Sequence, residues 1–411
     1  MSEIKASNRT IIWILGALAT VTPFAIDMYL PAFSQIAKDL GSTPATISLS
    51  VSSYFIGMAL GQILYGPLLD RFGRKRPLYV GLILFIIASI GCMQSHDVTT
   101  LVTFRFFQAV GGSVAWVGAM AMVRDFFPVQ ESARIFSLLI LILGVSPLLA
   151  PTFGGFITTT VGWQSIFLIL AGLTVLLLIV VIFYLPEGHQ PDSTISLKPK
   201  PIVENFISIL KNTQFNTYAF AGAFSFATLF IYVAGSPIIF MEIYHVDPKA
   251  YGGIFALLSV GFIGSSQLNI LVNRHHTSDK IFRIALFVQV ATGLIFLLGV
   301  LTNSFGLYST IVMFFICLSC IGFINPNANA LALAPFTRTI GSASALMGCT
   351  QIGVAALSSF GVGLFNSMDA IPIVTLMMLT SSTALLILIF GLRRVGRSIV
   401  IASTSAENAA H

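Results

Sequence analysis

The stretch GPLLDRFGRKRPL, residues 66–78, separates two long apolar runs and so forms a short connection between them. A connection this short must reverse direction tightly. Gly66 permits close helix approach, and Gly73 permits a turn geometry that a side chain would hinder. Asp70 can meet the amino end of the next helix or pair with a cation, while Arg71 and Arg74 lie at the membrane surface. A merely basic loop would explain the cations, but not the glycines and the acid between them.

The apolar runs on either side belong to a series that extends through the whole chain. Of its 411 residues, 56% are hydrophobic and 9% are charged, against about a quarter charged in soluble domains. A spanning helix needs roughly 20 apolar residues, and the sequence offers about twelve such runs. They lie at residues 11–33, 46–66, 78–95, 99–122, 133–158, 163–185, 213–242, 250–272, 281–301, 305–327, 341–366 and 370–392. The runs are continuous and do not alternate, which predicts an all-α membrane protein of 12 transmembrane helices and not a barrel.

The net charge is +6, and the distribution of Lys and Arg among the loops predicts the topology. With an even number of spans both termini lie on one side, and nearly all Lys and Arg lie in loops on that side. Only Lys38 and Lys249 fall in loops on the other side, and Arg105 falls within a span. The positive-inside rule therefore predicts a multi-pass membrane protein with both termini in the cytoplasm. The basic excess thus reflects topology, and no nucleic-acid partner is expected.

A polar interval divides the chain into two halves. It contains several charged residues and three prolines, and is the longest between spans. We predict an N-terminal six-helix bundle at 1–186, a cytoplasmic linker at 187–212, a C-terminal six-helix bundle at 213–393 and a cytoplasmic tail at 394–411. Residues 206–210, within this linker, are expected to form a short helix.

Two charges lie inside predicted spans. Asp27 lies in the otherwise uncharged run 11–30, where a charge costs roughly 3 kcal/mol and usually serves transport or proton relay. Arg105 lies at a similar depth, about 9 Å from the start of its own span. The two could interact directly or through water. The alternatives are an acid at a helix end that reaches the interface, and a static ion pair that only fixes packing.

Residues 66–78 closely resemble the signature loop of the major facilitator superfamily. In that family the Asp and Arg of the loop form a charge cluster with residues at the cytoplasmic end of span four, where this chain has Arg124 and Asp125. The resemblance implies a cluster that closes the cytoplasmic side when the site faces outward. The gating residues it implies are Gly66, Asp70, Arg71, Gly73, Arg74, Arg124 and Asp125. Arg105 resembles the arginine of a second motif of that superfamily, which is tied to proton coupling. This chain departs from that motif at Ala109, where Gly is usual.

Span five contains Pro147, Pro151, Gly154 and Gly155. This arrangement resembles the motif of proton-driven exporters in the superfamily, with Ala150 in place of the expected Gly. The alternative is a kinked helix that says nothing about the direction of transport. Further matches narrow the resemblance to the bicyclomycin and chloramphenicol resistance (Bcr/CflA-type) drug/proton antiporters, over nearly the whole ordered chain. They lie at residues 27–32, 146–151, 235–237, 264–269 and 341–346.

The resemblance implies that spans one, four, seven and ten line the cavity. Their uncommitted polar and aromatic residues are the candidates for substrate binding: Tyr29, Gln108, Tyr232, Ser236, Asn325 and Asn329. Packing or hydrogen bonding between helices is an equally good explanation for each. Glu242 is either a second proton site or a solvated helix end, and we favour the solvated end.

The sequence has no phosphate-binding loop of the Gly-x-x-x-x-Gly-Lys-Ser/Thr type, so the proton gradient and not ATP is the expected energy source. We expect no metal, no cofactor and no enzymatic activity. The expected partners are a small-molecule substrate, protons and the lipid bilayer, and the protein is expected to be a monomer. The function that the resemblance implies is proton-coupled efflux of amphipathic drugs across the bacterial inner membrane, with Asp27 and Arg105 in proton coupling. Export of an endogenous metabolite or siderophore is the alternative; import by symport is a third possibility.

Overall fold

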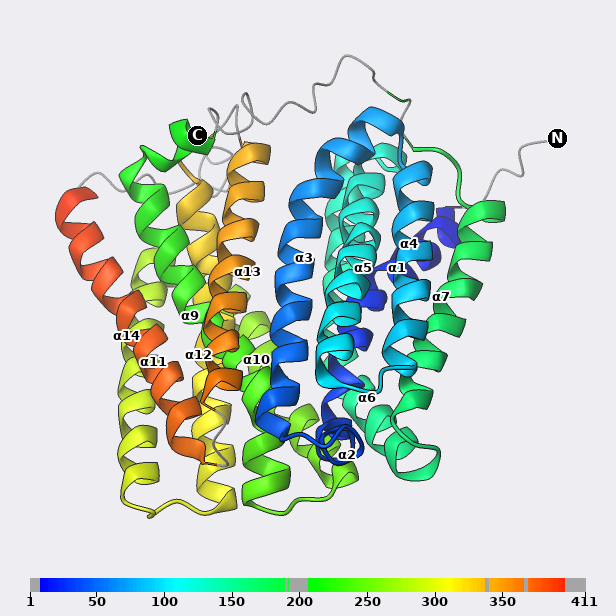
Figure 1. Ribbon diagram of the computed structural model, residues 1–411. Coiled ribbons are helices and arrows are strands. Elements are labelled where there is room, and N and C mark those ends of the chain that lie inside the picture. Colours follow the sequence, from blue (N-terminus) through cyan, green and yellow to red (C-terminus); the bar gives the residue numbers. More distant parts are fainter. Residues whose placement is uncertain (1–7, 189–190, 192–205, 337–339, 366–368, 396–411) are drawn as a thin grey trace, which may run out of the picture. The chain divides into compact units, whose positions relative to one another are not determined.

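The computed structural model describes residues 8–188, 191, 206–336, 340–365 and 369–395, and all regular secondary structure in these ranges is helical (Figure 1). The long helices are α1 (Asn8–Asp27), α3 (Pro44–Phe72), α4 (Lys75–Met93), α5 (Val98–Phe126), α6 (Val129–Thr160), α7 (Gln164–Tyr184), α9 (Thr213–Pro237), α10 (Pro248–Val272), α11 (Ser278–Leu301), α12 (Leu307–Leu333), α13 (Ile340–Leu364) and α14 (Ala370–Val395). Shorter elements are η1 (Leu30–Ala32), α2 (Phe33–Asp39) and η2 (Ile238–Ile243). Residues 206–210 are helical, as predicted.

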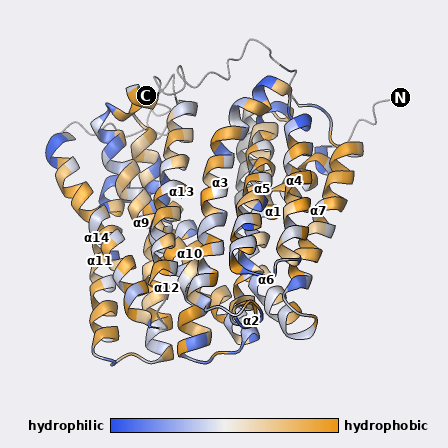
Figure 2. Cartoon of the chain, viewed as in Figure 1, coloured by the Kyte–Doolittle hydropathy of each residue, from blue (hydrophilic) through white to orange (hydrophobic). Residues whose placement is uncertain are grey.

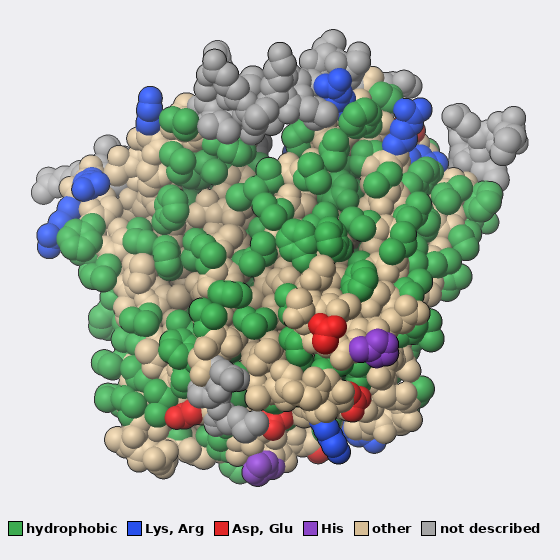
Figure 3. Space-filling model, viewed as in Figure 1, with side chains coloured by type: hydrophobic (Ala, Val, Ile, Leu, Met, Phe, Trp, Pro, Cys, Tyr) green, Lys and Arg blue, Asp and Glu red, His purple; other side chains and the backbone are tan. Residues whose placement is uncertain are grey.

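Each predicted span coincides with one of the long helices. In the described chain, 11 helices are long and apolar enough to cross a membrane, and α6 is the remaining long helix. Their outer faces are apolar: Val80, Leu176 and Phe287 are 60–65% exposed. Figures 2 and 3 show hydrophobic residues along the helices and Lys and Arg mainly near helix ends. Faces of this kind suit the hydrocarbon of a bilayer and confirm the predicted all-α membrane fold.

The first span differs from its predicted limits. We predicted an end near residue 33, but α1 ends at Asp27 and the chain continues through η1 and α2 to Asp39. Pro31 explains the break, because it has no N–H to donate to the carbonyl of Asp27. Instead the N–H of Ala32 bonds the carbonyl of Tyr29 at 3.1 Å, as in a 3-10 turn. Asp27 is therefore the last residue of a regular helix.

The seventh span is also irregular at its end. The α-helix α9 stops at Pro237, and η2 continues it as a π-helix in which the N–H of Tyr244 bonds the carbonyl of Ile239 at 3.1 Å. The predicted limits of this span, 213–242, agree with α9 and η2 together. The widened turn changes which side chains of the span share a face.

The chain forms two compact units. The first comprises Met1–Leu197, Ile231–Val260 and Ala356–Ile373, and the second comprises Lys198–Phe230, Gly261–Ala355 and Val374–His411. The first unit takes segments from both predicted bundles, whereas the second takes none from the predicted N-terminal bundle. The predicted division into bundles, linker and tail stays a prediction.

In the first unit α5 is the central helix and packs against α1, α3, α4 and α6. The contact between α3 and α5 is close at Gly57, where an added Cβ would overlap the backbone oxygen of Phe106. Small residues permit this approach and allow dense packing between apolar helices. The arrangement fixes the position of Arg105, which is on α5.

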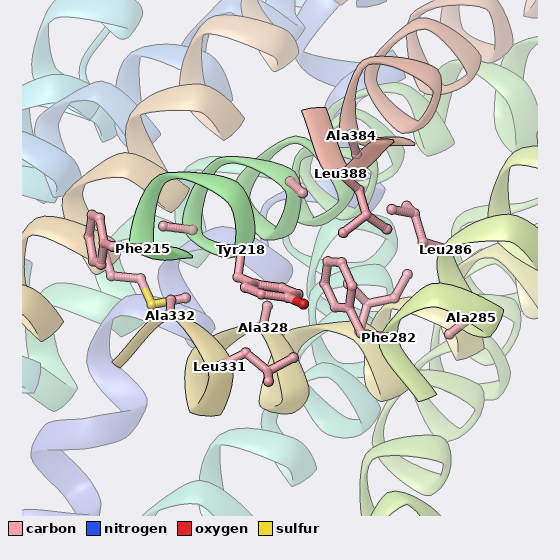
Figure 4. Packing of buried hydrophobic residues seen from close by; sticks show 14 of the residues in the cluster. Phe215, Tyr218, Phe282, Ala285, Leu286, Ala328, Leu331, Ala332, Ala384 and Leu388 are labelled. Carbon is pink, nitrogen blue, oxygen red and sulfur yellow. The ribbon is translucent and has the colours of Figure 1, made fainter. Parts of the chain in front are cut away.

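The second unit has an apolar core built from α9, α11, α12, α13 and α14 (Figure 4). Tyr218 of α9 and Phe282 of α11 meet edge to face with ring centroids 5.4 Å apart. The Tyr218 hydroxyl donates to the Asp279 carboxylate at 2.6 Å, and Arg283 pairs with the same carboxylate. The buried aromatic rings and the polar edge together hold the ends of α9 and α11 in contact.

Candidate functional site

Asp27 ends α1 in the first unit and is buried, with 6% of its surface exposed. Within the described chain no ion pair or hydrogen bond holds its carboxylate. Its electrostatic neighbours are three tyrosines from three other helices: Tyr54 of α3, Tyr232 of α9 and Tyr251 of α10. A carboxyl group held among tyrosines and still slightly accessible can bind and release a proton.

Arg105 is fully buried on α5. Its Nη1 donates to the backbone oxygen of Ala25 at 3.0 Å and to Oε1 of Gln108 at 2.6 Å. Aromatic rings surround the rest of the guanidinium. Its Cζ lies 4.3 Å from the ring centroid of Tyr54, 4.6 Å from that of Tyr29 and 5.9 Å from that of Phe167. The cation is thus stabilised by ring faces and a carbonyl oxygen.

Asp27 and Arg105 do not form a direct pair, which was one of the two interactions that their similar depth suggested. Nη1 of Arg105 is already bonded to Ala25 and Gln108, and among the three rings around the guanidinium carbon that of Tyr54 is the nearest. The reading as a static ion pair is therefore wrong for this structure. The position of each charge in its apolar run predicts its depth in the membrane. The direction in which each side chain points depends instead on the rotation of its helix.

Four predicted substrate residues lie in the first unit, and all are buried. Tyr29 shares a hydrogen bond with Ser50 at 2.8 Å, and Gln108 donates to Ser89 at 2.8 Å. In the same unit, Ser236 bonds the Tyr251 hydroxyl at 2.9 Å, and the ring of Tyr232 stacks on Phe255 at 5.4 Å. Tyr29 and Gln108 thus hold Arg105 in place, while Ser236 and Tyr232 belong to the tyrosine cluster near Asp27. Substrate contact by these four residues stays a prediction.

Two further candidates, Asn325 and Asn329, lie on α12 in the second unit. Both accept a hydrogen bond at 3.0 Å from Nε2 of Gln351, which the sequence analysis did not single out. Beside them Asn327 donates to Asn269 at 2.7 Å. The three residues Asn325, Asn329 and Gln351 form one amide cluster, in which Gln351 is buried and the two asparagines are half-buried.

The proline and glycine residues of span five lie in α6, which is helical through both Pro147 and Pro151. Gly154 packs directly on the backbone of Met28, so closely that an added Cβ would overlap its carbonyl oxygen. Gly155 packs in the same way on the backbone of Pro248 at the start of α10. The motif is therefore in contact with the residue that follows Asp27.

The loop 66–78 forms a charge cluster with the end of α5. Arg74 pairs through Nη1 with Asp70 at 2.6 Å and through Nε with Asp125 at 2.7 Å. Burial alone would lower the pKa of Arg74, but the hydrogen bonds to Asp125 and Asp70 outweigh it and raise the pKa above its ordinary value. Gly73 has φ +81°, which favours glycine and ends α3. Arg74 is thus the centre of the cluster.

Other predicted members of this cluster have different surroundings. A Cβ at Gly66 would meet no atom within 4 Å, so the expected close helix approach is absent there. Arg71 is half-buried with its Cζ 5.8 Å from the ring of Phe72, and Arg124 is exposed. Their part in gating stays a prediction.

Glu187 belongs to the same cluster, although the sequence analysis assigned it only to the linker. Its carboxylate accepts the backbone N–H groups of Arg74 and Lys75 at the start of α4. A carboxylate at a helix amino end satisfies free N–H groups and the helix dipole. An acid directly after a proline at the end of a span was the available sequence clue.

Glu242 is half-buried in η2 and accepts a hydrogen bond from the hydroxyl of Ser34 in α2. The favoured description, a solvated helix end, is therefore wrong in part. The contact joins the end of the first span to the end of the seventh.

Comparison with curated proteins finds relatives that match most of the chain. An uncharacterized MFS-type transporter, YdgK of Bacillus subtilis, is 32% identical over 94% of this chain and 96% of its own length. The bicyclomycin resistance protein homolog of Haemophilus influenzae is 32% identical over 86% and 88%. The multidrug resistance protein MdtL of Escherichia coli is 31% identical over 87% and 90%.

Solved structures share the fold at low sequence identity. The D-xylose-proton symporter matches with a TM-score of 0.71 at 14% identity, over 93% of this chain and 97% of its own. A bacterial homolog of the human lysosomal transporter Spinster matches with a TM-score of 0.66 at 14% identity, over 94% and 96%. The family model of the Major Facilitator Superfamily matches residues 15–359. On this match and on the relatives that cover most of its length, this chain belongs to the major facilitator superfamily of membrane transporters.

Proposed function

We propose that this protein exports small amphipathic drugs across the bacterial inner membrane in exchange for protons, with both termini in the cytoplasm. The names of two relatives, a bicyclomycin resistance protein homolog and a multidrug resistance protein, support the cargo. The observation that carries the proton coupling is Asp27, a buried acid without an ion pair in the described chain. The uneven distribution of Lys and Arg supports the orientation.

Asp27 has the properties that exchange requires. In the proposal, an apolar surrounding would favour its protonated form, while the charge of Arg105, which lies against the ring of Tyr54, would favour its charged form. A change of conformation or a bound substrate alters the balance between these two effects. In the proposed cycle Asp27 takes up a proton from the outer side, releases it to the cytoplasm, and loads substrate when deprotonated.

The predicted substrate residues and the gating cluster have separate parts in this cycle. Tyr232 and Ser236 lie in the tyrosine cluster with Asp27 and would contact an apolar cargo with a few hydrogen-bond partners. The cluster of Arg74, Asp70 and Asp125 joins α3, α4 and α5 at their ends and would hold the cytoplasmic side closed. No ATP-dependent step or cofactor enters the proposal.

The experiment is a drug-susceptibility panel in a bacterium that lacks its own pumps. Wild type, Asp27→Asn and the exposed control Asp97→Asn are expressed at matched levels, with amphenicols and other amphipathic drugs. We expect wild type and control to confer resistance and Asp27→Asn to give the susceptibility of the empty vector. Resistance kept by Asp27→Asn would refute coupling at this residue. Wild type without any effect would refute drug export and favour the metabolite exporter.

A further inference from the structure

In the first unit, four of the buried polar atoms without a hydrogen-bond partner in the described chain lie on three neighbouring helices. They are Oγ1 of Thr22 on α1, the hydroxyl of Tyr54 on α3, and Nε and Nη2 of Arg105 on α5. Buried polar groups nearly always have a partner, and ordered water often supplies it. Their grouping indicates a small internal polar site.

Tyr54 is the member of this group that connects the two intramembrane charges. Its side chain is fully buried, and its ring centroid lies 4.3 Å from Cζ of Arg105. Its hydroxyl interacts electrostatically with Arg105 and with Asp27, and Thr22 is its polar neighbour. Among the described residues, no other side chain both contacts the guanidinium of Arg105 and interacts electrostatically with Asp27.

We propose that Tyr54 is a positioning residue for proton exchange at Asp27, and that its hydroxyl, with Thr22 and a bound water molecule, connects Arg105 to the Asp27 carboxylate. The inference rests on the proposed function. A tyrosine hydroxyl both accepts and donates, so it can accept from an Arg105 N–H group and donate toward the charged carboxylate. Arg105 thereby stabilises the deprotonated acid without a direct ion pair that would trap it.

The surroundings of Asp27 leave few other candidates for this role. The titratable side chains that face it are Tyr54, Tyr232 and Tyr251, from α3, α9 and α10. In the described chain Asp27 interacts with no titratable side chain of α6 or α7, and the cation Arg105 lies against the ring of Tyr54. Tyr251 already shares its hydroxyl with Ser236.

The test is Tyr54→Phe, which keeps the ring against Arg105 and removes only the hydroxyl. Tyr65→Phe, the same change at another buried position of α3, is the matched control. The readout is the titration of the Asp27 carboxyl in the purified full-length protein, followed by infrared difference spectroscopy and assigned by its loss in Asp27→Asn. In Tyr54→Phe we expect Asp27 to bind its proton about tenfold more tightly, so that the titration midpoint lies about one pH unit higher. We expect the control to match wild type.

An unchanged midpoint in Tyr54→Phe would overturn the inference. Thr22→Val removes the neighbouring hydroxyl at constant shape and should move the midpoint in the same direction, so the inference stays testable even where Tyr54→Phe does not fold. The outcome is separate from that of the proposed function. A shifted midpoint in a protein that exports no drug refutes only the function, and drug export through Asp27 with an unshifted midpoint refutes only the role of Tyr54.

Discussion

At the scale of single residues, the packing of α3 on α5 depends on which glycine faces the partner helix. An added methyl group at Gly57 would overlap the backbone oxygen of Phe106, whereas at Gly66 it would meet nothing within 4 Å. We expect Gly57→Ala to destabilise the protein by about 1–3 kcal/mol, because a backbone group cannot move aside, and Gly66→Ala to be neutral. Thermal unfolding in detergent measures both. Equal midpoints for the two variants would contradict this account.

The sequence predicted the two intramembrane charges but not their surroundings. Asp27 and Arg105 stand out because charges are rare in apolar runs. Tyr54 could not be chosen among 10 tyrosines and 35 phenylalanines, since its position follows from how α3 and α5 are rotated against each other. For the same reason the sequence left open both a direct and a water-mediated interaction of the two charges, and could not predict the aromatic rings around Arg105.

At the scale of helices, the start of α5 depends on Asp97. Its carboxylate accepts the N–H of Thr100 at 2.8 Å and the Thr100 hydroxyl at 2.6 Å, and the hydroxyl bond is the main cause that lowers the pKa of Asp97. A carboxylate whose pKa is lowered by folding stabilises the folded state at pH values above its unfolded-state pKa of about 4. This contribution is lost as the pH falls through the pKa of the folded state. Asp97→Asn keeps a capping oxygen but removes the charge.

We therefore expect Asp97→Asn to unfold about 1–2 °C below wild type at neutral pH and to match it in strongly acidic buffer. Unfolding midpoints in one detergent over a series of pH values measure this. A difference that persists unchanged at low pH would show that the charge is not responsible.

The limits of the helices were predictable where the apolar runs end in polar turns. They were not predictable at residues 28–39, where the chain after Asp27 breaks at Pro31 and then resumes as α2. Polar residues such as Ser34 suggested the end of a span, but Ser34 is used in a contact with Glu242. That contact joins segments about 200 residues apart, and local sequence carries no trace of it.

At the scale of the whole molecule, the charge asymmetry and the apolar runs predicted the architecture, and the family model confirms its class. The roles of particular residues in alternating access depend on two conformations, and a sequence pattern does not distinguish their stabilities. The cluster around Arg74 is the clearest case. It consists of contacts among α3, α4, α5 and Glu187, and its effect on transport must be measured through rates.

Asp125 permits that measurement because it lies far from Asp27 and Arg105. On α5 it is about 20 residues from Arg105, roughly 30 Å along the helix, so it cannot touch a substrate bound there. Asp125→Asn weakens the bonds from Arg74, and a hydrogen bond between charged groups is worth about 1.5–3 kcal/mol. We expect the maximal transport rate in inverted vesicles to fall about tenfold, because the conformational equilibrium shifts. The half-saturating drug concentration should stay within about twofold of wild type. Asp97→Asn is the control, and a change in half-saturation as large as the change in rate would place Asp125 in substrate binding instead.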